Sequence, residues 1–307
     1  MTGLLSSSRF RLAAGAALAL ALLPLWMSGY VLGVLTVAYY FGVFAMSWDL
    51  LFGYAGEVNF GPTFLIGLGA YVSGMLNAYT PVPMWLCIFI GAFAAVIGGA
   101  LLALPALRLR GPYFGLVTLV AVLILQQLIV IFAGVTGGEI GLAVPDVLSV
   151  HTDPNYYYAL GFMLISAAVL LGFARSPIGL ILEATGQDRI AAEALGFNVT
   201  KHKLLAFCLS AFFSGLAGAL MIFYLGTASV GTVLDIAVAV QIIIAAVLGG
   251  RRTIVGGALG AIFLIVAGEY LRPIGELSNF AVAGLALIVL MFVPDGFLGY
   301  FMRRRAR

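Results

Sequence analysis

The side chains that most often carry out chemistry are scarce in this sequence and lie far apart. The chain has 307 residues, with only two histidines and two cysteines. His151 and His202 stand alone in different polar segments, while Cys87 and Cys208 fall within apolar runs. Protein zinc sites draw closely spaced cysteine and histidine ligands together, and that spacing is absent here. A lone loop histidine is more often solvated than catalytic, so the pattern gives no support for an enzyme.

The sequence also lacks the pattern of a nucleotide site. A phosphate-binding loop needs the motif G-x-x-x-x-G-K-[ST], in which the lysine reaches the phosphates. The only two lysines, Lys201 and Lys203, have no such glycine-rich context. The metalloprotease motif H-E-x-x-H and the nucleophile turn G-x-S-x-G are absent as well. We therefore expect no cofactor on this chain.

The composition is that of a membrane protein. Hydrophobic residues make up 63% of the chain and charged residues 9%, and the mean hydropathy is +1.16. Soluble domains carry about 25% charged residues. Long apolar runs leave no stretch for a soluble domain, so residues 1–307 are predicted to form a single transmembrane domain. The net charge of +3 is too small to suggest a nucleic-acid partner.

The apolar runs predict an all-α polytopic membrane protein with about ten transmembrane helices. A helix that crosses the bilayer needs about 20 apolar residues. Glycine-rich segments are expected to break some of the helices, and glycines within the runs favour close packing. The predicted spans are 12–29, 31–51, 62–78, 84–104, 112–133, 157–174, 204–225, 233–250, 254–271 and 278–293.

The distribution of positive charge predicts the orientation. If the N-terminus is cytoplasmic and the spans alternate, all 15 Lys and Arg residues except Arg272 fall on the cytoplasmic side. Such a bias is the usual signature of cytoplasmic loops. Both termini are therefore expected in the cytoplasm. Residues 134–156 then form an extracytoplasmic loop, and residues 175–203 a cytoplasmic loop with one or two short helices.

Every charged side chain falls near a span end or in a loop. Carriers driven by protons or ions usually keep an ionisable group inside the membrane. Here the main mid-span polar residues are Gln126, Gln127 and Gln241. They have two possible roles: hydrogen bonding between helices, or contact with a transported solute. The absence of a central charge indicates that the energy for transport is supplied by another protein.

Several segments together carry a specific combination of motifs. They are Gly53–Gly61, Gly67–Tyr71, Thr136–Leu142, Ser176–Gly179, Ala191–Asn198, Lys203–Phe207 and Ser210–Leu220. In this combination they closely resemble the permease subunits of bacterial branched-chain amino acid ABC importers, the LivH/LivM family, and are nearer to LivM. The resemblance runs from about residue 35 to residue 297. The chain departs from the family pattern at Glu57, where glutamine is usual, and at Asn59, where serine is common.

The resemblance implies an importer subunit in a bacterial cytoplasmic (inner) membrane, surrounded by membrane lipid. Its partners would be a homologous, LivH-like permease, two ATP-binding subunits and an extracytoplasmic solute-binding protein. Relatives in this family are associated with urea, amides and aromatic acids as well as branched-chain amino acids. The alternative outside the family is a secondary transporter that works as a single chain.

The cytoplasmic loop resembles the coupling segment of ABC permeases. Residues 189–195 are predicted to form a short helix that Gly196 ends, and two lysines follow it. The resemblance implies that this segment docks onto the ATP-binding subunit. The competing interpretation is an ordinary solvated loop. The predicted coupling residues are Arg189, Ala192, Glu193, Ala194, Gly196, Lys201 and Lys203.

The segment Gly53–Gly61 is too polar and glycine-rich to face lipid. It is either a cytoplasmic loop or a break in a helix that lines the transport pathway, with Pro62 in the first turn of the next helix. In the second case the positive end of that helix would point at the pathway, and Glu57 and Asn59 would be candidate pathway contacts.

Two further glycine-rich segments have alternative explanations. Residues 248–260 have a glycine spacing similar to that of Gly53–Gly61 and predict either an internal repeat or simple helix packing. Arg251 and Arg252 are expected to anchor the inner interface or, as the second alternative, to contact an ATP-binding subunit. In the outer loop, Thr136, Gly137 and Gly138 form either a docking surface or gate, or a plain turn.

Overall fold

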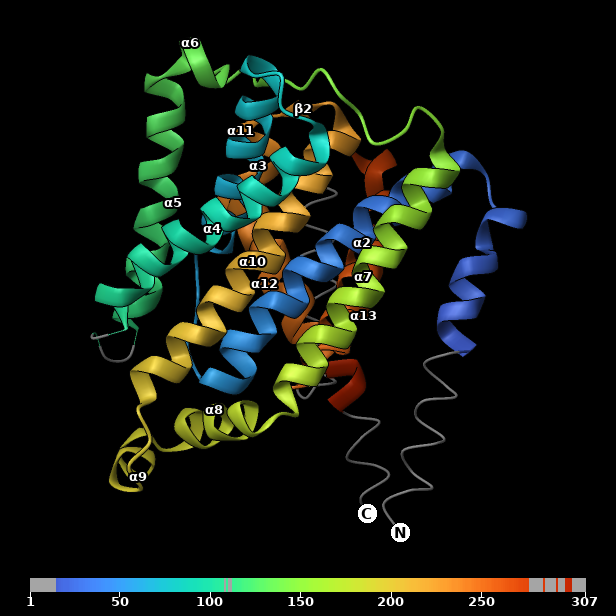
Figure 1. Ribbon diagram of the computed structural model, residues 1–307. Helices are drawn as coiled ribbons and strands as arrows, with labels where there is room; N and C mark the ends of the chain where they lie inside the picture. The colour runs from blue at the N-terminus through green and yellow to red at the C-terminus, as the bar shows by residue number, and fades with distance from the viewer. Residues whose placement is uncertain are drawn as a thin grey trace.

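The computed structural model describes residues 15–107, 109, 112–275, 284, 291 and 296–299. Long helices form an inclined bundle, with α8 and α9 at one end and α6, β2 and α11 at the other (Figure 1). These two ends are called the α8 end and the α6 end below. The helices are α2 (Gly29–Asp49), α3 (Pro62–Tyr79), α4 (Met84–Ala106), α5 (Tyr113–Ile131), α6 (Ala133–Thr136), α7 (Thr152–Ala174), α8 (Pro177–Gln187), α9 (Arg189–Ala194), α10 (Val199–Leu225), α11 (Val230–Val233), α12 (Ile236–Gly249) and α13 (Val255–Leu271).

Short segments complete the described chain. A helix over Gly15–Leu25 precedes α2 and ends in the 3-10 turn η1 (Leu23–Leu25). The π-helix η2 (Leu50–Ala55) continues α2, and the 3-10 turn η3 (Arg272–Ile274) follows α13. At the α6 end, strands β1 (Leu142–Ala143) and β2 (Thr227–Ala228) pair in antiparallel fashion. The all-helical prediction is therefore confirmed apart from these two short strands.

Most predicted spans contain a helix of suitable length. Among the described residues, 6 helices are long and apolar enough to cross a membrane. They are Gly29–Ala55, Met84–Ala106, Tyr113–Ile131, Thr152–Ala174, Val199–Leu225 and Val230–Gly249; Gly15–Leu25 and Val255–Leu271 are shorter. Helix α3 fills the predicted span 62–78. The predicted span 278–293 lies outside the described residues except for positions 284 and 291. The chain is a multi-pass membrane protein, while the count of ten and the orientation stay predictions.

Some predicted boundaries were wrong. Helix α7 begins at Thr152 rather than at residue 157, which shortens the predicted outer loop 134–156. The polar sequence Thr152–Asn155 was assigned to the loop, but Asp153 favours the positive end of a helix and proline is tolerated in the first turn. The predicted span 233–250, in contrast, is matched by the stretch Val230–Gly249, which an interruption at Leu234 and Asp235 divides into α11 and α12.

Helix α2 lies at the centre of the bundle and packs against α7, α10, α12 and α13. Its aromatic residues Tyr39, Tyr40 and Phe44 are fully buried. Helix α10 also packs against α3 and α4. These three helices approach so closely that a methyl group on Gly69 or Gly215 would overlap a neighbouring helix. Small residues allow this approach, which provides much of the association between helices in lipid.

Candidate functional site

The segment Gly53–Gly61 forms a helix break inside the bundle. Helix α2 continues through η2, which ends where Gly56 adopts the left-handed conformation with φ 71°. The following residues run beside α5: the Phe60 N–H donates to Thr118 Oγ1 at 3.1 Å, and Gly61 packs against the Thr118 carbonyl and the Val122 side chain. Val122 lies at the middle of α5. Of the two predicted alternatives, the structure therefore supports the break.

Asn59 is buried within this break and holds its backbone in place. The Asn59 side chain accepts a hydrogen bond from the Gly61 N–H at 2.9 Å, and its carbonyl accepts one from Trp48 Nε1 at 2.6 Å. As predicted, Pro62 begins α3. Proline suits this position because a helix leaves the first N–H without an intrahelical partner. The π-helix was not predicted, since a single extra backbone residue per turn leaves no pattern in an apolar run.

Asp49, which the sequence did not single out, is the most deeply buried carboxylate among the described residues. It is 1% exposed at the end of α2. Oδ1 accepts the Arg252 N–H at 3.0 Å, and Oδ2 accepts the N–H groups of Thr253 at 3.1 Å and Ile254 at 2.9 Å. A buried charge is costly unless hydrogen bonds compensate it. Here successive backbone N–H groups of one turn surround the carboxylate, as in other anion-binding turns.

That turn, residues 250–254, links α12 to α13 in an unusual conformation. Arg252 has φ 64° and Ile254 has φ 52°, in the region that glycine favours. For a β-branched residue this is a rare conformation, and such strain costs about 1–3 kcal/mol per residue. The hydrogen bonds to Asp49 compensate for this cost. They require the N–H groups of residues 252–254 all to point toward the Asp49 carboxylate.

The Arg252 side chain contacts the helix break and α8, a role that the sequence did not indicate; its anchoring of the inner interface stays a prediction. Its Nε donates to the Gly53 carbonyl at 2.9 Å, and a terminal nitrogen pairs with Glu183 of α8 at 3.2 Å. The Tyr54 hydroxyl donates to the Arg252 carbonyl at 2.9 Å. We call Asp49, Tyr54, Glu183 and residues 252–254 the Asp49 cluster. The neighbouring Arg251 instead lies over the Phe52 ring, 4.6 Å from its centroid.

A second connection joins the break to α10. Lys203 Nζ and Glu57 Oε1 are 2.6 Å apart, and their side chains are only 7% and 16% exposed. The predicted pathway residue Glu57 and the predicted coupling residue Lys203 are thus an ion pair. Of the two lysines, Lys201 is the exposed one. Next to this pair, Gly56 lies against Gly186 of α8, where an added Cβ would come within 3.0 Å of the Gly186 Cα.

Helices α8 and α9 confirm the expectation of short helices in the segment 175–203. The Asp188 side chain caps α9 by accepting the Ala191 N–H at 3.0 Å. Gly196 ends it as predicted, with φ 87° and open space around its Cα. Helix α9 extends away from the bundle (Figure 1), and Ile190 and Leu195 are 79% and 75% exposed.

The other predicted coupling residues lie on α9. Arg189 and Glu193 form an exposed ion pair of 2.8 Å. Ala192 is buried, whereas Ala194 is exposed. Between α9 and the break lies a cleft of about 560 Å³. It is lined by Gly56, Glu57, Val58, Leu109, Pro112, Thr185, Gly186, Arg189, Ile190, Glu193 and Lys203.

The predicted glutamines lie apart from this site, nearer the α6 end. Gln126 donates a hydrogen bond to the carbonyl of Leu234, between α11 and α12, at 2.8 Å. Of its two predicted roles, this is hydrogen bonding between segments of the bundle. Gln127 is exposed on α5, and Gln241 is half-buried on α12. Their contact with a solute stays a prediction.

The outer-loop residues form a compact turn after α6. Gly137 and Gly138 have φ values of 76° and 57°, and the Gly138 N–H donates to Thr136 Oγ1 at 3.3 Å. This geometry is that of a helix-ending turn, and its docking or gating role stays a prediction.

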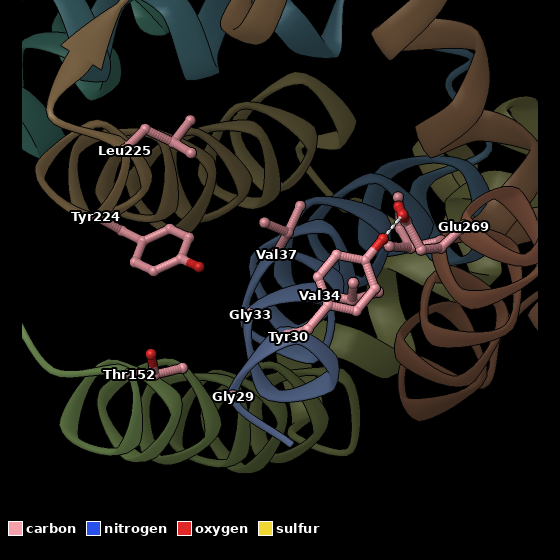
Figure 2. A pocket seen from close by; sticks show the side chains of 10 residues that line it. Gly29, Tyr30, Gly33, Val34, Val37, Thr152, Tyr224, Leu225 and Glu269 are labelled. Carbon is pink, nitrogen blue, oxygen red and sulfur yellow. Dashed lines mark hydrogen bonds between the residues drawn. The ribbon is translucent and has the colours of Figure 1, made fainter. Parts of the chain in front are cut away.

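The α6 end contains an open cleft that the sequence did not indicate. Figure 2 shows its lining, with the Tyr30 hydroxyl hydrogen-bonded to Glu269. The cleft has a volume of about 370 Å³ and lies between α2, α7, α10 and α13. Glu269 also pairs with Arg272 at 3.0 Å, and these side chains are 25% and 72% exposed.

A multi-pass bundle with a helix broken inside it is characteristic of membrane transport proteins. The comparisons with known proteins agree. Residues 30–294 match the family described as "Branched-chain amino acid transport system / permease component", and the chain belongs to that family. The resemblance deduced from the motifs is thereby confirmed.

Individual relatives point the same way. The chain is 28% identical to the high-affinity branched-chain amino acid transport system permease protein LivM of Salmonella typhimurium and of Escherichia coli, over 90% of this chain and 71% of LivM. It is 24% identical to LivH of Salmonella typhimurium over 84% of this chain and 91% of LivH. No solved structure matches the chain.

Proposed function

We propose that this chain is a transmembrane permease subunit of an ABC importer for branched-chain or other amino acids, in a bacterial cytoplasmic membrane. Family membership and the similarity to LivM over most of both chains support this role. Its partners would be a LivH-like permease, two subunits that bind ATP and magnesium, and an extracytoplasmic binding protein. The chain itself would perform no catalysis and would provide part of the solute pathway.

The orientation follows from charge. Among the described residues, the α8 end carries every lysine and arginine except Arg272. Because cytoplasmic loops are enriched in these residues, we place the α8 end in the cytoplasm. Exposed aromatic residues of the kind that mark a membrane interface cluster at the α6 end. They are Trp26, Tyr30, Tyr79, Trp85 and Tyr158.

The observation that carries the proposal is that α9 projects from the α8 end, while the helices on either side of it, α8 and α10, both contact the helix break. An ATP-binding subunit that moved α9 would also move α8, which packs on η2 and touches Gly56 through Gly186. The ion pair between Lys203 and Glu57 transmits the same movement from α10. A change in the cytoplasmic subunits would thereby reach the interior of the bundle.

Copurification tests this assignment. The chain, expressed with its partner subunits, should retain ATP-binding subunits in mild detergent. Gly196→Pro forces φ away from 87° and removes the Gly196 N–H that donates to the Glu193 carbonyl at 3.0 Å. Glu193→Arg reverses one exposed charge on the same helix. Both variants should remain folded and monodisperse but should lose ATP-driven uptake.

The matched control is Glu139→Arg, the same charge reversal in an exposed position at the α6 end. It should retain the ATP-binding subunits. Normal assembly and uptake in both α9 variants would refute the proposed coupling role. If the wild type shows ATP-driven uptake, competition by leucine, urea and aromatic acids would identify which of these solutes it carries.

A further inference from the structure

The Asp49 cluster contains a buried charge and a strained turn that the proposed function does not by itself explain. We propose that the cluster is a rigid joint, in which Asp49 and the Arg252–Glu183 pair are positioning residues that make η2, the α12–α13 turn and α8 move as one unit. The inference rests on the proposed function and adds a second route, separate from the Glu57–Lys203 pair, by which movement at α8 enters the bundle.

Asp49 fixes the turn in one orientation. Both carboxylate oxygens are used, and the three N–H donors come from consecutive residues. The conformation with positive φ at Arg252 and Ile254 places these donors side by side. Because Asp49 is only 1% exposed, water cannot replace its carboxylate as the acceptor. The end of α2 and the start of α13 must therefore move together.

Arg252 extends the joint to α8. Its backbone N–H binds Asp49, its carbonyl accepts from Tyr54, and its side chain reaches both Gly53 and Glu183. One residue thus connects α2, η2, the turn and α8. The Arg252–Glu183 pair is about one-third exposed, at 34% and 35%. It is the only part of the joint, among the described residues, that attaches α8 by a charged contact.

The turn also joins two helices, α12 and α13, that pack closely against each other. Gly249 of α12 and Gly256 of α13 are in backbone contact, and Gly260 packs on the Ala245 carbonyl. Helix α13 also packs closely on α2, where Gly257 faces Ala45 and Gly42 faces Ala258. With no side chains between them to deform, these helices cannot slide independently. A displacement of α8 is therefore carried to α12, α13 and α2.

Charge reversal tests the joint. In the complete transporter, Arg252→Glu and Glu183→Arg should each leave assembly and ATP hydrolysis intact. Uptake per ATP hydrolysed should fall severalfold, because each substitution replaces the attraction between Arg252 and Glu183 with repulsion between like charges. The double variant Arg252→Glu/Glu183→Arg should restore part of the coupling, since it restores the ion pair but not the hydrogen bond to the Gly53 carbonyl. A merely structural role would lower the yield of folded protein without changing the ratio of uptake to hydrolysis.

The matched control is Arg251→Glu, since the adjacent Arg251 contacts Phe52 rather than the cluster. Its ratio of uptake to hydrolysis should stay close to that of the wild type. The joint would be refuted if Arg252→Glu kept the wild-type ratio, or if the double variant did no better than the single ones. Absence of ATP-dependent uptake in the wild type would instead refute the proposed function.

Cross-linking separates a rigid joint from a hinge. Phe52→Cys and Arg251→Cys place thiols on the two sides of the joint, in a chain that also carries Cys87→Ala and Cys208→Ala. A short bis-methanethiosulfonate, which joins two thiols through disulfides that a reductant can cleave, should link them without loss of uptake, because a rigid joint does not open during the cycle. If cross-linking stopped uptake and reduction restored it, the segments would move relative to one another and the joint would be a hinge.

Discussion

The two ends of the bundle use the same kinds of side chains in opposite ways. At the α8 end, Asp49 is 1% exposed and binds three backbone N–H groups, and Lys203 is 7% exposed in its pair with Glu57. At the α6 end, Glu269 pairs with an arginine that is 72% exposed, beside an open cleft of about 370 Å³. Buried pairs fix segments in place, whereas exposed pairs contribute little to stability.

This difference matches what each end is proposed to do. Force from ATP-binding subunits can act on a distant pathway only if the segments that receive it do not deform. The end that accepts a solute has no such requirement and can be open. The comparison therefore predicts that matched substitutions will have larger effects at the α8 end than at the α6 end.

The largest effect is expected for Asp49→Ala. It would leave the buried N–H groups of Thr253 and Ile254 and the part-buried N–H of Arg252 without an acceptor. At about 1–3 kcal/mol for each buried donor, the free energy of unfolding should fall by roughly 2–6 kcal/mol or more. The matched substitution Glu269→Ala, in the exposed pair, should cost about 0–1 kcal/mol. Thermal unfolding in detergent, followed by size-exclusion chromatography, compares the two. Equal shifts in the two unfolding midpoints would contradict the claim that the α8 end depends more on its buried carboxylate than the α6 end does on its exposed pair.

The next effect concerns the Glu57–Lys203 pair. Lys203→Met leaves the Glu57 carboxylate nearly buried without its partner, which should cost about 3–5 kcal/mol. The double variant Lys203→Met/Glu57→Leu removes both charges and should recover most of that loss. Unfolding midpoints of the two single variants and the double variant form the test. If the double variant were as unstable as Lys203→Met, the loss of stability would not come from an unpaired Glu57 carboxylate.

A smaller contrast comes from two glycines that end helices. Gly56 and Gly226 have nearly equal φ values, 71° and 73°, but an added Cβ would lie 3.0 Å from Gly186 at the first and 3.8 Å from Val147 at the second. Alanine in this conformation costs about 1–2 kcal/mol. Gly226→Ala should show that cost alone, and Gly56→Ala a further loss because α8 must move. A larger shift for Gly226→Ala in unfolding experiments would contradict the tighter packing of the α8 end.

The smallest effect is expected on α9, which lies at the α8 end but outside its buried core. Arg189 and Glu193 are 35% and 49% exposed, so Glu193→Gln should change the free energy of unfolding by no more than about 0.5 kcal/mol. Raising the salt concentration should change the stability of the wild type equally little. A loss as large as that of Lys203→Met would mean that α9 is part of the folded core.

Features with a local cause were the predictable ones. Apolar runs predicted the helices, Pro62 marked the start of α3, and Gly196 ended α9 because a left-handed residue follows many helices. The Asp49 cluster was missed because an aspartate at the end of a span resembles an ordinary interfacial charge. Its partners lie 203 to 205 residues away in the chain, and Lys203 lies 146 residues from Glu57. Pairings over such distances depend on the packed fold and leave no pattern in the sequence.

The central claim is that this permease is moved by energy supplied through the α8 end. The most direct measurement is amino acid accumulation in vesicles that contain the chain, its partner permease and the ATP-binding subunits, with the solute-binding protein supplied on the α6 side. It is compared with accumulation in vesicles that contain the chain alone. Accumulation should require both the ATP-binding subunits and hydrolysable ATP, and should persist when ion gradients are abolished. Robust accumulation by the chain alone, without ATP, would contradict the claim.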